Sequence, residues 1–134
     1  MGTEKSREIE AWLLKAQNDL DAARLLAEAD PPKRDIAVYH CQQAAEKTLK
    51  AWLVFRDIPF PKTHDLEKLL SLDLPNTPAL ARLAGHGHIL SPYAVEFRYP
   101  GDLIEPDGKT CEEALRLASE VGVLIRALLK GNAV

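Results

Sequence analysis

Hydrophobic residues recur along the chain at steps of three and four, the spacing that gathers them on one face of an α-helix. This pattern predicts three long helices, over residues 6–29, 35–57 and 111–130. Prolines at 31–32 end the first helix, and prolines at 59 and 61 end the second, because proline breaks the hydrogen-bond ladder of a helix. No stretch alternates apolar and polar residues over a useful length, so the pattern predicts an all-α bundle.

Shorter elements join the long helices. The sequence predicts short helices over residues 65–72 and 78–84, one or two helical turns over 92–99, and a loop for the stretch GHGHILSP. Thr110 and Glu113 have the spacing of a capping box, so they are expected to begin the last helix. A chain of 134 residues is expected to form a single domain, residues 1–134.

Composition fits a soluble globular protein, with 46% hydrophobic and 28% charged residues. The net charge of −3 gives no general attraction for nucleic acids, although residues 33–68 carry 7 basic and 5 acidic side chains. Cys41 and Cys111 are expected to be reduced, buried thiols. No apolar run is long enough to span a membrane and no signal peptide is visible, so we expect a cytoplasmic protein without membrane contact.

Most motifs for self-contained chemistry are missing. His86 and His88 supply two ligands where zinc needs three or four, so no metal site is expected. The sequence has no Walker A or dinucleotide-binding glycine loop, so no cofactor is expected. It also lacks the nucleophile elbow of serine hydrolases.

The stretch SPYAVEFRYPGD, residues 91–102, concentrates aromatic side chains around one arginine. The Arg98 guanidinium suits phosphate recognition, and a base could stack on Tyr93 or Tyr99. The alternative is that the tyrosines plug the bundle while Arg98 pairs with Glu96 or with an acid of the first helix.

Three lysines from the polar side of the second helix and its exit loop could add positive charge to such a site. They are Lys47, Lys50 and Lys62. Lys47 and Lys50 share a helix face, since they are three residues apart. The alternative is an ordinary solvated face.

Taken together, three segments resemble the HEPN (higher eukaryotes and prokaryotes nucleotide-binding) domain family in its short prokaryotic form. They are AQNDLDAARLL, DIAVYHCQQAAEKTLKAWLVFRDIPFPKTHDLEKLL and SPYAVEFRYPGD, and the resemblance covers about residues 8–130. It implies an antiparallel up-and-down bundle of about four main helices plus short segments, often paired into homodimers. It also implies one of two functions: pairing with a minimal nucleotidyltransferase in a toxin–antitoxin-like module, or metal-independent RNA cleavage by an arginine and a following histidine with four to six residues between them.

The cleavage motif is incomplete, because no histidine follows Arg98. We therefore predict a non-catalytic domain that binds a nucleotide or an RNA phosphate through Arg98, and that has a nucleotidyltransferase partner. One alternative is a ribonuclease toxin, using Arg82 with His88, which match the spacing, or Arg98 with a histidine from a partner subunit. Another is a structural homodimeric adaptor.

Overall fold

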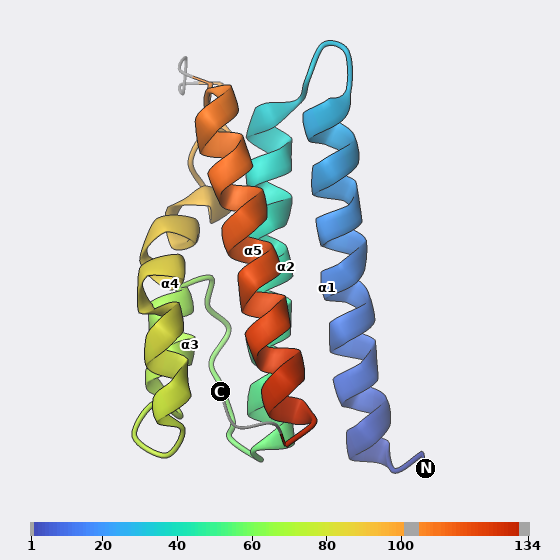
Figure 1. Ribbon diagram of the computed structural model, residues 1–134, viewed down its shortest axis with the longest axis vertical. Coiled ribbons are helices and arrows are strands. Elements are labelled where there is room, and N and C mark those ends of the chain that lie inside the picture. Colours follow the sequence, from blue (N-terminus) through green and yellow to red (C-terminus); the bar gives the residue numbers. More distant parts are fainter. Residues whose placement is uncertain (1, 101–104, 132–134) are drawn as a thin grey trace.

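The protein is described by a computed structural model that covers residues 2–100 and 105–131. Across these residues every regular element is helical and no strand occurs. Within the described residues, five α-helices and two short 3-10 helices follow one another (Figure 1): α1 (Glu4–Glu28), α2 (Arg34–Phe55), α3 (Leu66–Ser71), η1 (Pro78–Leu83), α4 (Ala84–Leu90), η2 (Ser91–Ala94) and α5 (Gly108–Leu129). The predicted all-α fold is confirmed.

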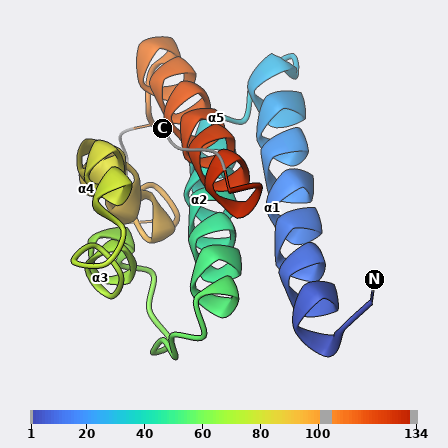
Figure 2. The same cartoon turned by 60° about the horizontal axis from the view of Figure 1, so that its bottom comes forward.

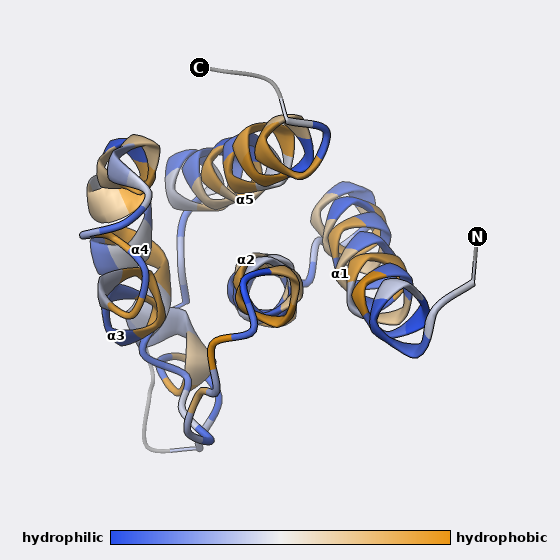
Figure 3. Ribbon diagram, turned by 90° about the horizontal axis from the view of Figure 1, so that it is seen from below, coloured by the Kyte–Doolittle hydropathy of each residue, from blue (hydrophilic) through white to orange (hydrophobic). Residues whose placement is uncertain are grey.

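Helix α2 forms the centre of the bundle. It packs against α1 on one side and α5 on another, while the short helices α3 and α4 cover a third side (Figures 2 and 3). The colours of Figure 1 show that α1 and α4 run in one direction and α2 and α5 in the other, which is the expected up-and-down order. None of the described helices is long and apolar enough to cross a membrane.

The central position of α2 follows from its sequence. Small residues such as Ala37, Ala44 and Ala45 are buried there, so neighbouring helix backbones can approach closely. The prediction for the thiols is confirmed, since Cys41 and Cys111 are both free and buried. Burial raises the pKa of Cys41 to about 12, which keeps the thiol protonated and unreactive.

The stretch GHGHILSP was predicted as a loop, and this was wrong, because its first residues form most of α4. A Cβ atom on Gly87 would lie 3.1 Å from Leu70 Cδ1 on α3. The glycine therefore permits close helix packing and does not mark a break.

The ends of two other elements also differ from prediction. Helix α5 begins at Gly108, since Asp107 and not Thr110 caps it: the Asp107 carboxylate accepts a hydrogen bond of 2.8 Å from the Thr110 backbone N–H. That hydrogen bond lowers the pKa of Asp107. The helical turns expected over 92–99 stop at Ala94, and Phe97 then adopts a left-handed backbone with φ of 66°.

A fully buried carboxylate, Asp73, connects α2 to the segment before η1. Its Oδ2 atom accepts hydrogen bonds from Trp52 Nε1 at 2.8 Å, Arg56 Nε at 3.2 Å and Thr77 Oγ1 at 2.7 Å. The three donors on Oδ2 offset part of the cost of removing the charge from water, whereas Oδ1 is buried without a hydrogen bond to the described residues. The cluster therefore fixes the entry to η1 on the end of α2.

Candidate functional site

A pocket of about 370 Å³ opens beside the first two turns of α2. Two segments far apart in sequence line it: Asp35, Ile36, Tyr39 and His40 of α2, and Phe97 and Arg98 of the chain after η2. We call it the Arg98 pocket. Its volume lies in the range of small-ligand sites.

Arg98 is held at the pocket by two contacts. Its guanidinium carbon lies 4.1 Å from the centre of the Tyr39 ring, and its Nη1 donates a hydrogen bond of 3.1 Å to the carbonyl oxygen of Ala94. It forms no ion pair with Glu96 or with an acid of α1 among residues 2–100 and 105–131. Its charge is therefore available to an anion that enters the pocket.

The backbone at Phe97 sets the direction of this segment. A positive φ is unfavourable for a bulky residue by on the order of 1–2 kcal/mol. The turn places both Phe97 and Arg98 on the pocket wall, while the Phe97 ring stays 6.1 Å from the ring of buried Tyr93. Strain at a pocket wall is typical of a position held for function.

His40 lies in the same pocket and is oriented by a buried carboxylate. Its Nδ1 atom is 2.8 Å from Asp19 Oδ1 of α1, and the other Asp19 oxygen accepts a 2.5 Å hydrogen bond from Lys47 Nζ. A carboxylate on Nδ1 fixes the ring so that Nε2 is directed elsewhere. The pocket therefore combines an oriented imidazole with a guanidinium.

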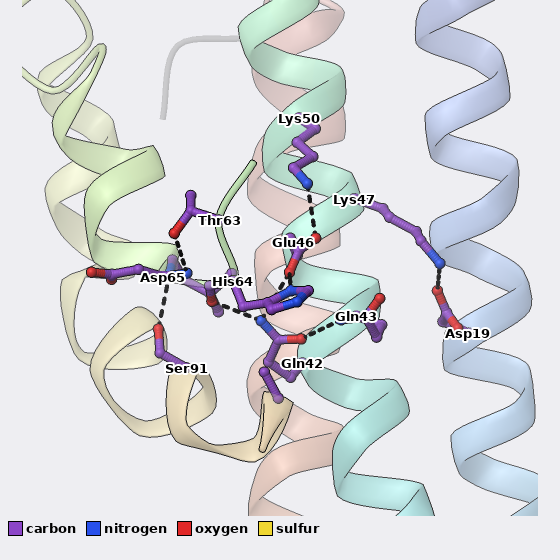
Figure 4. Close-up of polar contacts among 12 residues, drawn as sticks. Asp19, Gln42, Gln43, Glu46, Lys47, Lys50, Thr63, His64, Asp65 and Ser91 are labelled. Atoms are coloured by element: carbon purple, nitrogen blue, oxygen red, sulfur yellow. Dashed lines mark hydrogen bonds and ion pairs between the residues drawn. The ribbon is translucent and has the colours of Figure 1, made fainter. Parts of the chain in front are cut away.

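The other residues predicted for the site do not converge on the Arg98 pocket. Tyr93 is buried in the core, where burial raises its pKa, and Tyr99 is exposed. Lys50 donates to Glu46 at 2.9 Å and its ammonium lies 5.6 Å from the ring centres of both Trp12 and Phe60. Lys47 donates a hydrogen bond to Asp19, as Figure 4 shows, and Lys62 is exposed in the loop after α2.

The segments QQAAEK and PKTHDL meet in a polar cluster in which Gln42 and Glu46 are buried and His64 is exposed (Figure 4). Gln42 Nε2 donates to the carbonyl oxygen of His64 at 2.9 Å, and His64 Nδ1 lies 2.8 Å from Glu46 Oε1. Burial alone would raise the pKa of Glu46, but hydrogen bonds from Lys50, His64 and Gln42 outweigh it and lower the pKa. The cluster anchors the loop that leads to α3 and is structural.

Arg82 and His88, the weaker catalytic alternative, are directed to different neighbours. Arg82 lines a groove together with His86, whereas His88 Nδ1 contacts Glu67 Oε1 of α3 at 3.4 Å. No group of three potential metal ligands occurs among the described residues.

Comparison with known proteins identifies the family. The HEPN domain model matches residues 9–128. The chain belongs to the HEPN domain family. Two solved structures resemble this HEPN domain over most of its length, and no curated protein sequence matches it.

The first of these structures is ST0689, an archaeal HEPN homologue, which is 24% identical with a TM-score of 0.69 over 90% of this chain and 96% of that one. The second is TT1696 from Thermus thermophilus, which is 27% identical with a TM-score of 0.73 over 88% of this chain and 95% of that one. Both therefore share the fold of this HEPN domain along nearly their whole length.

The sequence pattern gave no clear sign that His40 belongs with Arg98. His40 is partly buried, and its orientation depends on Asp19 of another helix. One signal was present, since positions 35, 36, 39 and 40 lie on one side of a helix. That face carries the charged Asp35, the apolar Ile36 and the rings of Tyr39 and His40.

Proposed function

We propose that this HEPN domain binds a nucleotide or an RNA phosphate in the Arg98 pocket without cleaving it. The observation that carries the proposal is the Arg98 guanidinium, which is stacked on Tyr39 and has no carboxylate partner among the described residues. A planar guanidinium can pair with two phosphate oxygens at once, and an aromatic ring beneath it limits its motion.

The remaining pocket residues suit the other parts of a nucleotide. A base can stack on the Phe97 ring, and the Asp35 carboxylate can accept hydrogen bonds from ribose hydroxyls or base amino groups. Exposed Tyr99 would extend contact along a longer RNA, Lys47 would support the site through Asp19, and Tyr93 would support it through its contact with Phe97. Lys50 and Lys62 would add only positive charge at a distance from the pocket. This assignment keeps Arg98 as the residue that contacts phosphate.

A second candidate function, RNA cleavage without metal, is favoured by one specific observation. His40 is oriented by buried Asp19 and lines the same pocket as Arg98, so both groups come from a single chain. His40 would take the proton from a ribose 2′-hydroxyl, whose oxygen would attack the adjacent phosphorus to form a 2′,3′-cyclic phosphate. The 5′-oxygen would leave as a hydroxyl after taking a proton from water. Arg98 would stabilise the extra negative charge on the phosphate.

One experiment separates these two functions. Wild-type protein, Arg98→Ala and His40→Gln are mixed with labelled RNA and with adenosine monophosphate in the presence of a metal chelator, and binding and strand integrity are both measured. We expect intact RNA and a loss of affinity of roughly 10- to 100-fold in Arg98→Ala, because a charge-assisted hydrogen-bond pair is removed. The exposed Arg24 of α1, replaced by alanine, is the matched control and should bind as the wild type does.

If the wild type cleaves RNA and His40→Gln does not, the protein is a ribonuclease and the function without cleavage is wrong. Unchanged affinity in Arg98→Ala, with an unchanged melting temperature, would show that the Arg98 pocket is not the site. Unfolding of Arg98→Ala would mean that the arginine serves packing.

We also propose that the domain forms a homodimer and pairs with a minimal nucleotidyltransferase in a toxin–antitoxin-like module. Support comes from exposed apolar side chains on the two segments that line the Arg98 pocket, where Ile36, Val95 and Tyr99 are 45%, 52% and 60% exposed. Apolar side chains gathered beside a charged site are typical of a surface that another protein covers.

Affinity purification from the native host, read by mass spectrometry, tests the pairing. We expect a small nucleotidyltransferase to accompany the wild type and to be lost with Val95→Asp, since a buried charge disrupts an apolar contact. Val123→Asp, at a 71% exposed valine on α5, is the control and should retain the partner. Recovery of the bait alone would contradict the pairing, and a dimer that binds neither RNA nor nucleotide would support the adaptor alternative.

A further inference from the structure

The Arg98 pocket is lined by one carboxylate and one guanidinium, and neither has an ion-pair partner among the described residues. Asp35 lies in the first turn of α2, and its side chain forms no hydrogen bond or ion pair with residues 2–100 or 105–131. Asp35 and Arg98 also form no ion pair with each other, although both line one pocket. This lining fits a ligand with an anionic end for Arg98 and a second end rich in hydrogen-bond donors for Asp35.

His40 adds a further acceptor to the α2 side of the pocket. Its Nδ1 atom lies 2.8 Å from Asp19 Oδ1, and an ionised carboxylate can only accept, so Nδ1 carries the proton and donates it. A neutral His40, whose side chain is 27% exposed, therefore has only the lone pair of Nε2 left for a ligand. Asp35 and His40 both offer acceptors, while the charged donor Arg98 comes from the other segment.

The four bases of RNA present different donors to such acceptors. On its Watson–Crick edge, guanine carries two adjacent donors, N1–H and the 2-amino group, at the spacing of the two oxygens of a carboxylate. Adenine and cytosine have a ring-nitrogen lone pair beside their amino group, and uracil has a single N–H between two carbonyl oxygens. Each of those acceptors would face the Asp35 carboxylate unpaired and repelled. Guanine is therefore the base that fits Asp35.

We propose that the Arg98 pocket is selective for a guanine nucleotide, an inference that rests on the function proposed above and adds the identity of the base. The Asp35 carboxylate accepts hydrogen bonds from N1–H and from the 2-amino group. The guanine ring lies on Phe97, and the Arg98 guanidinium, stacked on Tyr39, binds the phosphate. Asp35 determines which base is accepted, whereas Arg98 supplies affinity for any nucleotide.

Nucleotides that differ only in the base test this selectivity. Guanosine, inosine and adenosine monophosphate are titrated into the full-length wild type by calorimetry. Inosine lacks the 2-amino group and should bind roughly 10-fold more weakly than guanosine, because one hydrogen bond to a carboxylate is lost. Adenosine should bind more weakly still, since its ring-nitrogen lone pair faces Asp35. The same comparison in an oligouridine that carries one guanosine or one inosine distinguishes RNA from a free nucleotide as the source of the base.

Asp35→Asn should change which base is preferred. The new amide keeps one acceptor and adds a donor, so guanosine monophosphate should lose its advantage over inosine monophosphate. Xanthosine monophosphate, which has an oxygen in place of the 2-amino group, should bind this variant at least about tenfold more tightly than it binds the wild type. An aspartate that only stabilises the start of α2 would change the melting temperature and leave the base preference unaltered. Asp21→Asn on α1 is the matched control and should keep the wild-type order of affinities.

The outcomes separate this proposal from the function on which it rests. Equal binding of the guanosine, inosine and adenosine nucleotides, with affinity still lost in Arg98→Ala, would overturn the guanine selectivity and leave the proposed function in place. Binding of neither nucleotide nor RNA would overturn both. An order of affinities that is unchanged in Asp35→Asn would overturn the role of Asp35. The wild-type series needs no variant, so it decides the selectivity even if Asp35→Asn does not fold.

Discussion

Replacing Asp73 by alanine is expected to destabilise the domain by about 3–5 kcal/mol, a large part of the stability of a domain of this size. The substitution leaves the Trp52 indole N–H, the Thr77 hydroxyl and the Arg56 guanidinium without their shared acceptor. Trp52 is itself buried, so its N–H has no route to water. Urea unfolding followed by tryptophan fluorescence measures the change.

Two milder variants define how the Asp73 cluster works. Thr77→Val removes one donor and should cost about 1 kcal/mol, the usual net value of a hydrogen bond. Asp73→Asn keeps the shape and one acceptor oxygen, so its effect should fall between those of Thr77→Val and Asp73→Ala. A loss below about 1 kcal/mol in Asp73→Ala would show that the cluster does not stabilise the fold.

The cluster around Glu46 is expected to make the fold sensitive to acid. Because hydrogen bonds from Lys50, His64 and Gln42 lower the pKa of Glu46 in the folded state, the carboxylate binds its proton more readily in the unfolded chain. Its contribution is therefore complete above the ordinary pKa of a glutamate, and it is lost as the pH falls through the lower folded value. Glu46→Gln should cost on the order of 2–3 kcal/mol at neutral pH.

Unfolding by urea between pH 3 and pH 7 checks the sign. The difference in unfolding free energy between wild type and Glu46→Gln should be largest at neutral pH and should shrink as the pH falls below about 4.5. Glu67→Gln is the matched control, since Glu67 also faces a histidine, His88, but both side chains are more than half exposed. A gap between wild type and Glu46→Gln that does not change with pH would contradict the role assigned to this carboxylate.

The positions of the long helices could be predicted from the hydrophobic pattern because each of them buries apolar residues at helical spacing. The predicted 35–57 and the observed Arg34–Phe55 differ by only one or two residues at either end. The pattern was less informative for α4. Its glycines are typical of a loop, although Gly87 is there to allow close helix packing. The sequence pattern also favoured Thr110 as the cap of α5. Both Asp107 and Thr110 have side chains that can cap a helix, and only the backbone conformation shows that Asp107 does so.

Arg98 was identified from sequence because aromatic and cationic residues cluster around it, and the structure places it in a pocket. The cluster of Asp19, His40 and Lys47 could not be predicted in the same way, because its members come from two helices whose relative rotation depends on the packed core. Lys47 and Lys50 share a helix face, yet they meet different carboxylates, Asp19 and Glu46. Sequence spacing shows which residues are neighbours on a helix, but it does not show which acid each one meets.

The contact between Asp19 and His40 limits how far the chain can be shortened without losing the Arg98 pocket. Asp19 belongs to α1, His40 to α2 and Arg98 to the chain after η2, so the smallest continuous piece containing all three runs from residue 19 to residue 98. Such a piece lacks α5, against which α2 packs. A peptide copied from residues 91–100 would carry the arginine but neither the ring beneath it nor the imidazole beside it. The pocket can therefore be transplanted only as a whole bundle.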